Sequence, residues 1–407
     1  MLTIENGVLI KCDENATEVV IPDSVTEIGE WAFSYCSLTS IIIPDSVKKI
    51  GKNAFAYSYL LATVVISEGT TEIGDYAFIG CESLTSINIP KGIREIGVAT
   101  FAECTALASI EIPNGVTTIR NQAFSHCTAL KSVIIPESVT EIEGSAFSDC
   151  DSLATVKISD KVNKIGQFAF YGCKALKSVT IPDGVSEIEE HVFCGCESLV
   201  SANIPKQVTK IPDSLFSLCT ALTSFGIPEN ITTIGAYAFK GCKSLTSIII
   251  PESVSEIEEN AFCDCESLKS VEIPNSVTKI GEYSFSNCKS LTTIRLPDNI
   301  KVIDFNTFSD CNSLTSILIP NGLTAIQTDA FKNCKSLKSI SIPKTAKLIA
   351  DDAFVNCTSL QTIEFEGTEE QWTEIFYTSD EYDYDKEDLS NLEYKIHFKN
   401  EKNVYSK

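Results

Sequence analysis

Histidine is the side chain best suited to acid–base catalysis at neutral pH, and this chain of 407 residues contains three. They are His126, His191 and His397, and the first two stand at variable positions of a repeat, three copies apart. An enzyme needs acids, bases or nucleophiles that converge on one point. No Gly-x-Ser-x-Gly, His-Glu-x-x-His or phosphate-binding glycine motif accompanies them. We therefore expect surface histidines, no catalytic residue, no cofactor and no enzymatic activity.

Cysteine is the second candidate for chemistry, because seventeen cysteines could bind zinc or form disulfides. Fourteen of them occupy one position of the repeat, so their side chains would lie side by side in stacked copies. Their Cα–Cβ bonds would then be parallel, which suits a disulfide poorly. We expect a row of free, packed thiols, since cysteine behaves as a small buried residue. This row comprises Cys36, Cys81, Cys104, Cys127, Cys150, Cys173, Cys196, Cys219, Cys242, Cys265, Cys288, Cys311, Cys334 and Cys357.

Three cysteines lie outside this row, namely Cys12, Cys194 and Cys263. The last two form Cys-x-Cys pairs with Cys196 and Cys265, three repeats apart. At the spacing of stacked strands this separation is on the order of 15 Å, too far for one zinc ion. We expect no metal site, and the many free thiols favour a reducing compartment.

The residues above belong to a 23-residue repeat that is written about fifteen times. One copy reads Leu84-Thr85-Ser86-Ile87-Asn88-Ile89-Pro90, followed by Ile93, Ile96, Phe101 and Cys104. A period of 20–29 residues with this spacing of leucine-like residues predicts a leucine-rich solenoid. A single copy cannot bury its apolar faces, so neighbouring copies must stack to form a continuous core.

Each position of the repeat has an expected role. Leu84, Ile87 and Ile89 should face inward from a short strand, and Pro90 should end it because it cannot donate a ladder hydrogen bond. Ile93 and Ile96 should fill the return path on the opposite face. The phenylalanine is invariant in fifteen copies and predicts an aromatic spine. Its central members are Phe101, Phe124, Phe147, Phe170, Phe193, Phe216, Phe239 and Phe262, beside Cys104, Cys127, Cys150 and Cys173.

The residue after the second isoleucine is usually glycine, as in Gly74 and Gly281. Other copies carry Glu, Arg, Asp, Gln or Ala there, and one carries Pro212. A positive φ is therefore not required at this position, and proline excludes it in that copy.

The predicted fold is an α/β-type repeat solenoid, mostly β, forming a curved right-handed arc with a concave parallel sheet and capped ends. Residues 1–21 should form a strand cap, because Asn6-Gly7 between apolar runs predicts a hairpin. Residues 22–366 hold the repeats. Residues 367–407 should form a second cap, with a short helix over Glu369–Phe376, an acidic loop over Thr378–Asp388 and a strand over Tyr394–Phe398. The acidic loop lacks the glycine and terminal glutamate of a calcium-binding EF-hand, so we favour a solvated loop.

The net charge of −23 disfavours nucleic acid and anionic membrane as partners, because both repel an acidic surface. A cationic protein patch fits this charge, although solubility alone also explains it. No run approaches the roughly 20 apolar residues that span a bilayer, so no membrane insertion is expected. The opening Met1–Gly7 lacks the features of a signal peptide. This start fits a cytoplasmic protein or a mature chain without its leader.

The word Ile273-Pro274-Asn275-Ser276-Val277-Thr278-Lys279-Ile280-Gly281, followed by Phe285, Cys288 and Leu291, resembles the BspA-like leucine-rich repeats. The resemblance covers roughly residues 18–366, and the tail Glu366–Trp372 is similar to the terminal segment of that family. It implies a curved right-handed solenoid that is used in surface adhesion and in binding host or partner proteins, without chemistry. Family members are often exported and anchored, and this chain shows neither device.

The residue two before the proline should alternate onto the inner face of the sheet, and its identity varies. This column is the expected ligand-binding surface, with Val20, Ile42 and Val65 as an apolar patch. An idle sheet with drifting β-formers explains the variation equally well. A serine or threonine row four residues before the proline could bind sugar, but small β-compatible residues are the simpler explanation. The column comprises Val20, Ile42, Val65, Asn88, Glu111, Ile134, Lys157, Thr180, Asn203, Gly226, Ile249, Glu272, Arg295, Leu318, Ser341 and Glu364.

Two functions remain open at this point. The first is an adhesin-like module that binds a protein, or a glycan, through the concave sheet. The second is an intracellular protein-interaction scaffold of the same fold. The identity of the ligand and the oligomeric state stay open as well.

Overall fold

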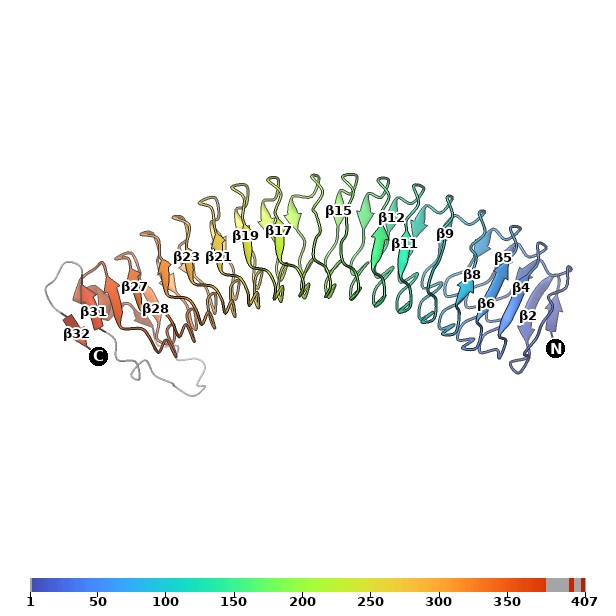
Figure 1. Cartoon of the computed structure of the whole chain (residues 1–407), viewed down its shortest axis with the longest axis horizontal. Helices are drawn as coiled ribbons and strands as arrows, with labels where there is room; N and C mark the ends of the chain where they lie inside the picture. Colours follow the sequence, from blue (N-terminus) through green and yellow to red (C-terminus); the bar gives the residue numbers. More distant parts are fainter. Residues whose placement is uncertain (1, 378–394, 399–403, 407) are drawn as a thin grey trace. The chain divides into compact units, whose positions relative to one another are not determined.

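The computed structural model describes residues 2–377, 395–398 and 404–406. The chain divides into two units, Met1–Val208 and Thr209–Lys407, and each is described by itself. Within each unit short strands stack side by side, one coil for each 23-residue repeat (Figure 1). Among the described residues there is one short helix, α1 (Glu369–Glu374), so the protein is a mostly-β parallel solenoid.

Most coils contribute strands to two parallel ladders. The front ladder contains the strands that precede the proline, for example β4 (Ser40–Ile43), β6 (Thr63–Ile66) and β8 (Ser86–Ile87). The rear ladder contains two-residue strands that end at the second isoleucine, for example β3 (Glu27–Ile28) and β5 (Lys49–Ile50). The strand before the proline was predicted. The rear strand was expected only as a return path, because two residues are too short to show an alternating pattern.

The remaining strands of the first unit follow the same scheme. Its front ladder also contains β11 (Ser132–Ile134) and β13 (Thr155–Lys157). Isolated bridges continue it from Thr155 to Ser178 and from Ser178 to Ser201. The rear ladder also contains β7 (Glu72–Ile73), β9 (Glu95–Ile96), β10 (Thr118–Ile119), β12 (Glu141–Ile142), β14 (Lys164–Ile165) and β15 (Glu187–Ile188).

The second unit repeats both ladders. Its front strands are β17 (Ser224–Gly226), β19 (Ser247–Ile249), β21 (Ser270–Glu272), β23 (Thr293–Arg295), β25 (Ser316–Leu318), β27 (Ser339–Ile342) and β29 (Thr362–Phe365). Its rear strands are β16 (Lys210–Ile211), β18 (Thr233–Ile234), β20 (Glu256–Ile257), β22 (Lys279–Ile280), β24 (Val302–Ile303), β26 (Ala325–Ile326), β28 (Leu348–Ala350) and β30 (Phe376–Tyr377).

The predicted N-terminal hairpin is present. Strands β1 (Leu2–Glu5) and β2 (Val8–Cys12) are antiparallel, and Asn6 and Gly7 join them with φ values of 50° and 80°. Positive φ at both turn residues suits the twist of a two-residue hairpin. Strand β2 then pairs with β3 and so continues the rear ladder.

At the C-terminal end, helix α1 begins with a capping box between Thr368 and Gln371. The helix ends at Glu374, two residues earlier than predicted, because Phe376 joins β30 beside β28. Strand β31 (Lys395–Phe398) pairs with β29 and with β32 (Val404–Ser406), close to the predicted strand. The predicted acidic loop, including any calcium-binding role, lies outside the described residues.

The spine phenylalanines form the centre of the core, and all fifteen are buried. Neighbouring ring centroids are 4.9–5.6 Å apart in the first unit, with interplanar angles of 2–12°. In the second unit they are 5.4–5.8 Å apart. Rings in successive coils therefore repeat one stacked geometry, which explains why no other residue replaces phenylalanine.

The backbone around the spine forms a corner that the sequence did not predict. In nearly every coil the residues two before and two after the phenylalanine have positive φ, as in Trp31 and Tyr35 around Phe33. The N–H groups of these three residues donate to carbonyls of the next coil at 2.7–3.3 Å. Asparagine, aspartate and glycine are frequent at these two positions because they tolerate the left-handed region.

The glycine after the second isoleucine does not have a positive φ, as predicted. Its role comes from close approach, since a Cβ atom on Gly74 would lie 2.7 Å from the backbone nitrogen of Lys52. A side chain at Gly74 must therefore shift the backbone of the preceding coil.

Candidate functional site

Where residues two before the proline fall within a front strand, they lie on the solvent face of the front ladder; Val20, Asn88, Glu111, Thr180 and Asn203 lie outside the front strands. In β4 the burial alternates, so Ile41 and Ile43 are buried whereas Ile42 is 67% exposed. Parallel register places Ile42 beside Val65 and Ile134 beside Lys157. In the second unit it places Glu272 beside Arg295. The residues of the predicted column are exposed, apart from the half-buried Asn203: Val20, Ile42, Val65, Asn88, Glu111, Ile134, Lys157, Thr180, Glu272 and Arg295.

Two members of the column have a structural role. Asn88 accepts a hydrogen bond from the Ile66 N–H at 2.8 Å and donates its amide to the Ile66 carbonyl at 2.6 Å. Asn203 makes the same two bonds to Ile181, both at 2.8 Å. Each side-chain amide therefore replaces a peptide group of the ladder. Sequence reasoning did not find this role, and asparagine in place of a β-former was its only signal.

Of the apolar patch predicted near the N-terminal end, Val20, Ile42 and Val65 are 89%, 67% and 46% exposed, and the ladder pairs Ile42 with Val65. The hydroxyl row faces the same side, because Ser40 and Ile42 are both exposed on β4. Ser40 pairs with Thr63, and Thr63 with Ser86, along the ladder. The face thus combines a regular hydroxyl row with a column of changing side chains.

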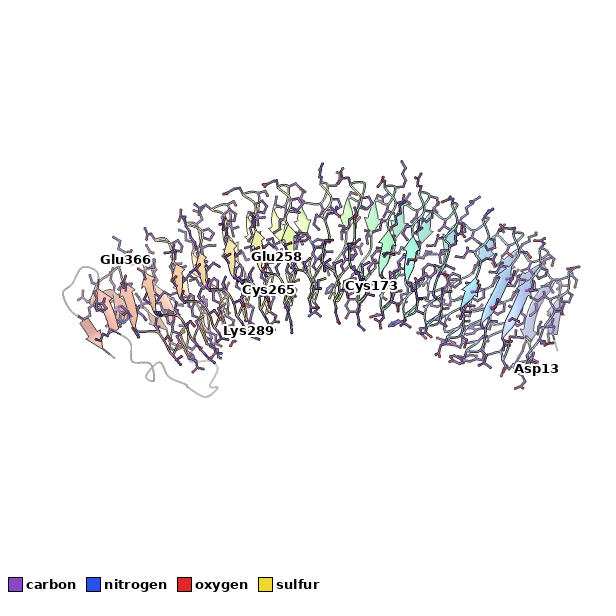
Figure 2. All side chains as sticks on the ribbon, viewed as in Figure 1. Asp13, Cys173, Glu258, Cys265, Lys289 and Glu366 are labelled. Carbon is purple, nitrogen blue, oxygen red and sulfur yellow. The ribbon has the colours of Figure 1, made fainter. Side chains whose placement is uncertain are left out.

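The cysteine row is buried, and all seventeen cysteines are free thiols. Figure 2 labels Cys173 in the first unit and Cys265 in the second, both among the stacked coils. Most row thiols donate a hydrogen bond to the carbonyl of the spine phenylalanine in the preceding coil; Cys173, for example, donates to the carbonyl of Phe147 at 3.2 Å. The same bond recurs along the row, for example from Cys104, Cys127 and Cys150.

Burial also decides the reactivity of these thiols. It raises the pKa of Cys127 to about 12. A thiol that stays protonated at neutral pH is a poor nucleophile and a poor metal ligand. The described residues contain no group of three or more histidines, cysteines or carboxylates that could hold a metal ion.

The histidines do not converge on a catalytic arrangement. His126 is exposed, and its Nε2 lies 3.7 Å from Asp149. His191 is half-buried rather than a plain surface residue, because its ring stacks on Phe168 at 4.6 Å. His397 is exposed on β31. In the part of the chain that the structure describes, no helix has the length and apolar character needed to cross a membrane.

Comparison with known proteins agrees with this geometry. The family model described as "BspA type Leucine rich repeat region (6 copies)" matches residues 2–131, 95–223, 141–269, 209–338 and 256–382. A solved leucine-rich repeat protein from Bacteroides ovatus is similar at 31% identity, with a TM-score of 0.77, over 88% of this chain and 92% of that one.

Two further solved structures are similar. One is a leucine rich cell surface protein from Faecalibacterium prausnitzii, at 30% identity and a TM-score of 0.51, over 92% of this chain and 97% of that one. The other is the pneumococcal vaccine antigen PcpA, at 20% identity and a TM-score of 0.52, over 93% and 94% of the two chains. The latter likeness concerns the fold alone. No curated protein matches the chain.

Proposed function

Because the chain belongs to the BspA-type leucine-rich repeat family, we propose that it is a non-catalytic module that binds a protein partner through the front ladder. The observation that carries this proposal is the column around Ile42 and Val65. Its side chains point to solvent from a regular scaffold, and their identity changes from coil to coil. A rigid ladder with one variable exposed position is suited to recognition, because little conformational entropy is lost on binding.

The proposal includes the architecture expected from the sequence. The front ladder forms the concave face of a right-handed solenoid, and residues 1–21 and 367–407 cap its ends. The apolar patch of Val20, Ile42 and Val65 is the anchor of the interface, since exposed apolar side chains that gather in one place mark interaction sites. The polar members of the column and the hydroxyl row supply polar contacts around it.

Adhesion at a cell surface is the preferred setting of this function. The solved Faecalibacterium structure, at 30% identity, is described as a cell surface protein. A glycan is the alternative ligand for the same face, because the hydroxyl row offers regular hydrogen-bonding groups. The seventeen free thiols favour a second candidate, an intracellular scaffold of the same fold, since thiols persist in a reducing compartment.

The test is a pull-down from the native cells and their surroundings, with the bound partner identified by mass spectrometry. The Ile42→Asp plus Val65→Asp double variant should lose that partner and keep its melting temperature, because both side chains face solvent. A second double variant, Ile249→Asp plus Leu318→Asp, makes the same change at exposed column positions of the second unit and measures how far the interface extends along the column. Unaltered affinity in the first double variant contradicts the front-ladder assignment.

A further inference from the structure

Three tyrosines, two of them exposed and one half-buried, form an aromatic cluster outside the front strands, which we call the tyrosine platform. Tyr35 and Tyr57 follow the spine phenylalanine by two residues in consecutive coils, and their rings stack at 5.4 Å with an angle of 23°. Tyr59 lies beside them, with its ring centroid 6.2 Å from that of Tyr57. Tyr35 is 55% exposed and Tyr59 is 46% exposed. A gathered aromatic surface of this kind in contact with water indicates a partner.

The next coils extend the platform with carboxylates. Tyr57 lies directly against Gly80, where a Cβ atom would clash with its ring. Burial raises the pKa of Tyr57, and the nearby Glu103 carboxylate raises it further, so the charge of Glu103 reaches the ring. Glu82 follows Tyr59 at the equivalent position of the next coil, and the backbone of its neighbour Ser83 donates to the Tyr59 carbonyl at 3.2 Å.

In later coils, the carboxylate at the position equivalent to Glu82 is neutralised by lysines of neighbouring coils. Asp151 occupies it in another coil of the first unit, and Lys174 of the next coil lies 3.1 Å from its carboxylate. In the second unit Glu266 lies between Lys243 at 3.5 Å and Lys289 at 3.0 Å. Glu82 has Tyr59 and Thr105 at these neighbouring positions instead. Within the described part of the chain neither Glu82 nor Glu103 forms an ion pair.

Other tyrosines of this protein already hold lysines on their faces. The Lys240 ammonium lies over the Tyr237 ring at 5.3 Å, and that of Lys52 lies over Tyr76 at 5.6 Å. Such contacts are favourable because the ring face is electronegative. In the tyrosine platform the Tyr35 and Tyr59 side chains are exposed to solvent, beside two carboxylates that form no ion pair with the described residues.

We propose that the tyrosine platform, together with Glu82 and Glu103, docks an extended arginine- or lysine-bearing segment of a partner protein. The cationic side chains lie over the exposed Tyr35 and Tyr59 rings and pair with the carboxylates. Arginine fits best, because its planar guanidinium both stacks on rings and binds a carboxylate through two donors. Alternate side chains of an extended segment are about 6.7 Å apart and stacked strands about 4.7–4.9 Å apart, so arginines at every second residue need the length of their side chains to contact neighbouring coils.

The test uses the full chain and a fluorescein-labelled peptide of six Arg-Ser repeats, with its anisotropy measured at 0.15 M NaCl. Tyr35→Ser plus Tyr59→Ser should weaken binding about tenfold, although it changes no charge. Glu82→Gln plus Glu103→Gln should weaken it by a similar factor. The charge-matched control is Asp151→Asn plus Glu266→Gln, whose carboxylates already have lysine partners, and it should change binding less than about twofold.

Three results overturn the proposal. The first is an unmodified protein that does not bind the peptide, or a tyrosine variant that binds it equally well. The second is an equal loss in the charge-matched control, which shows non-specific attraction to an acidic surface. The third is displacement of the peptide by a neutral oligosaccharide such as cellotetraose, which identifies the platform as a glycan surface. Circular dichroism of each variant verifies that the ladders are intact.

Discussion

The thiol of Cys81 donates a hydrogen bond to the backbone carbonyl of Phe55 in the preceding coil, with an Sγ···O distance of 3.2 Å. In one coil Ser58 takes the place of the cysteine, and its hydroxyl donates to the Phe33 carbonyl at 2.6 Å. The row position therefore requires a small side chain that is also a donor. This requirement connects the cysteine row to the phenylalanine spine and explains why apolar residues are missing from it.

Substitution of Cys150 should separate the donor from the packing contribution. Cys150→Ser keeps a donor for the Phe124 carbonyl and should cost less than about 1 kcal/mol of unfolding free energy. Cys150→Ala removes the bond and leaves a small void, so it should cost about 1–2 kcal/mol. Urea unfolding followed by circular dichroism gives both values. An alanine variant that is more stable than the serine variant contradicts the donor role.

The buried thiols should make the protein less stable in alkali. Burial raises the pKa of Cys81 to about 12, whereas an unfolded thiol titrates near 8.5. Above that pH the unfolded chain loses protons that the folded chain retains, so stability is full below about 8.5 and falls as the pH rises towards 12. The urea midpoint should therefore decrease steadily from pH 8 to pH 10.5. A constant midpoint means that the thiols ionise equally well in the folded protein.

Asn88 should contribute to stability although it stands in the proposed binding column. Asn88→Ala leaves the N–H and carbonyl of Ile66 without their side-chain partners and should cost about 1–3 kcal/mol. Glu111→Ala in the next coil of the column is the control, because its side chain is exposed and a surface change of this kind costs less than about 0.5 kcal/mol. Equal denaturation midpoints for the two variants would contradict the structural role assigned to Asn88.

Two glycines should respond to alanine in opposite directions. Gly74→Ala brings a methyl group to 2.7 Å from the Lys52 nitrogen and should destabilise the protein by about 1–3 kcal/mol. Gly226→Ala places its methyl where no atom lies within 4 Å, at an ordinary φ, and should stabilise the protein by about 0.5 kcal/mol. Thermal unfolding of the two variants measures the difference. A shift of the same sign in both contradicts the close-approach explanation.

The sequence by itself determined the parts that depend on side-chain periodicity. The 23-residue spacing, the strand that precedes Pro90, the inward Ile87 and the phenylalanine spine all follow from which residues recur and where. The exposure of Ile42 follows too, because successive side chains of a strand point to opposite faces. The free thiol row was predictable since stacked copies place equivalent residues side by side.

Only the tertiary structure decided how the backbones of successive coils contact one another. The two-residue rear strands, the positive φ at Trp31 and Tyr35 and the Cys81 bond to Phe55 all depend on groups about 20 or more residues apart. These contacts use N–H and carbonyl groups that every residue carries, so they leave little trace in residue type. The roles of Asn88 and of the tyrosine platform likewise depend on the adjacent coil. The hydrogen-bonding partner of Asn88 and the lack of a lysine beside Glu82 become apparent only when the coils are stacked.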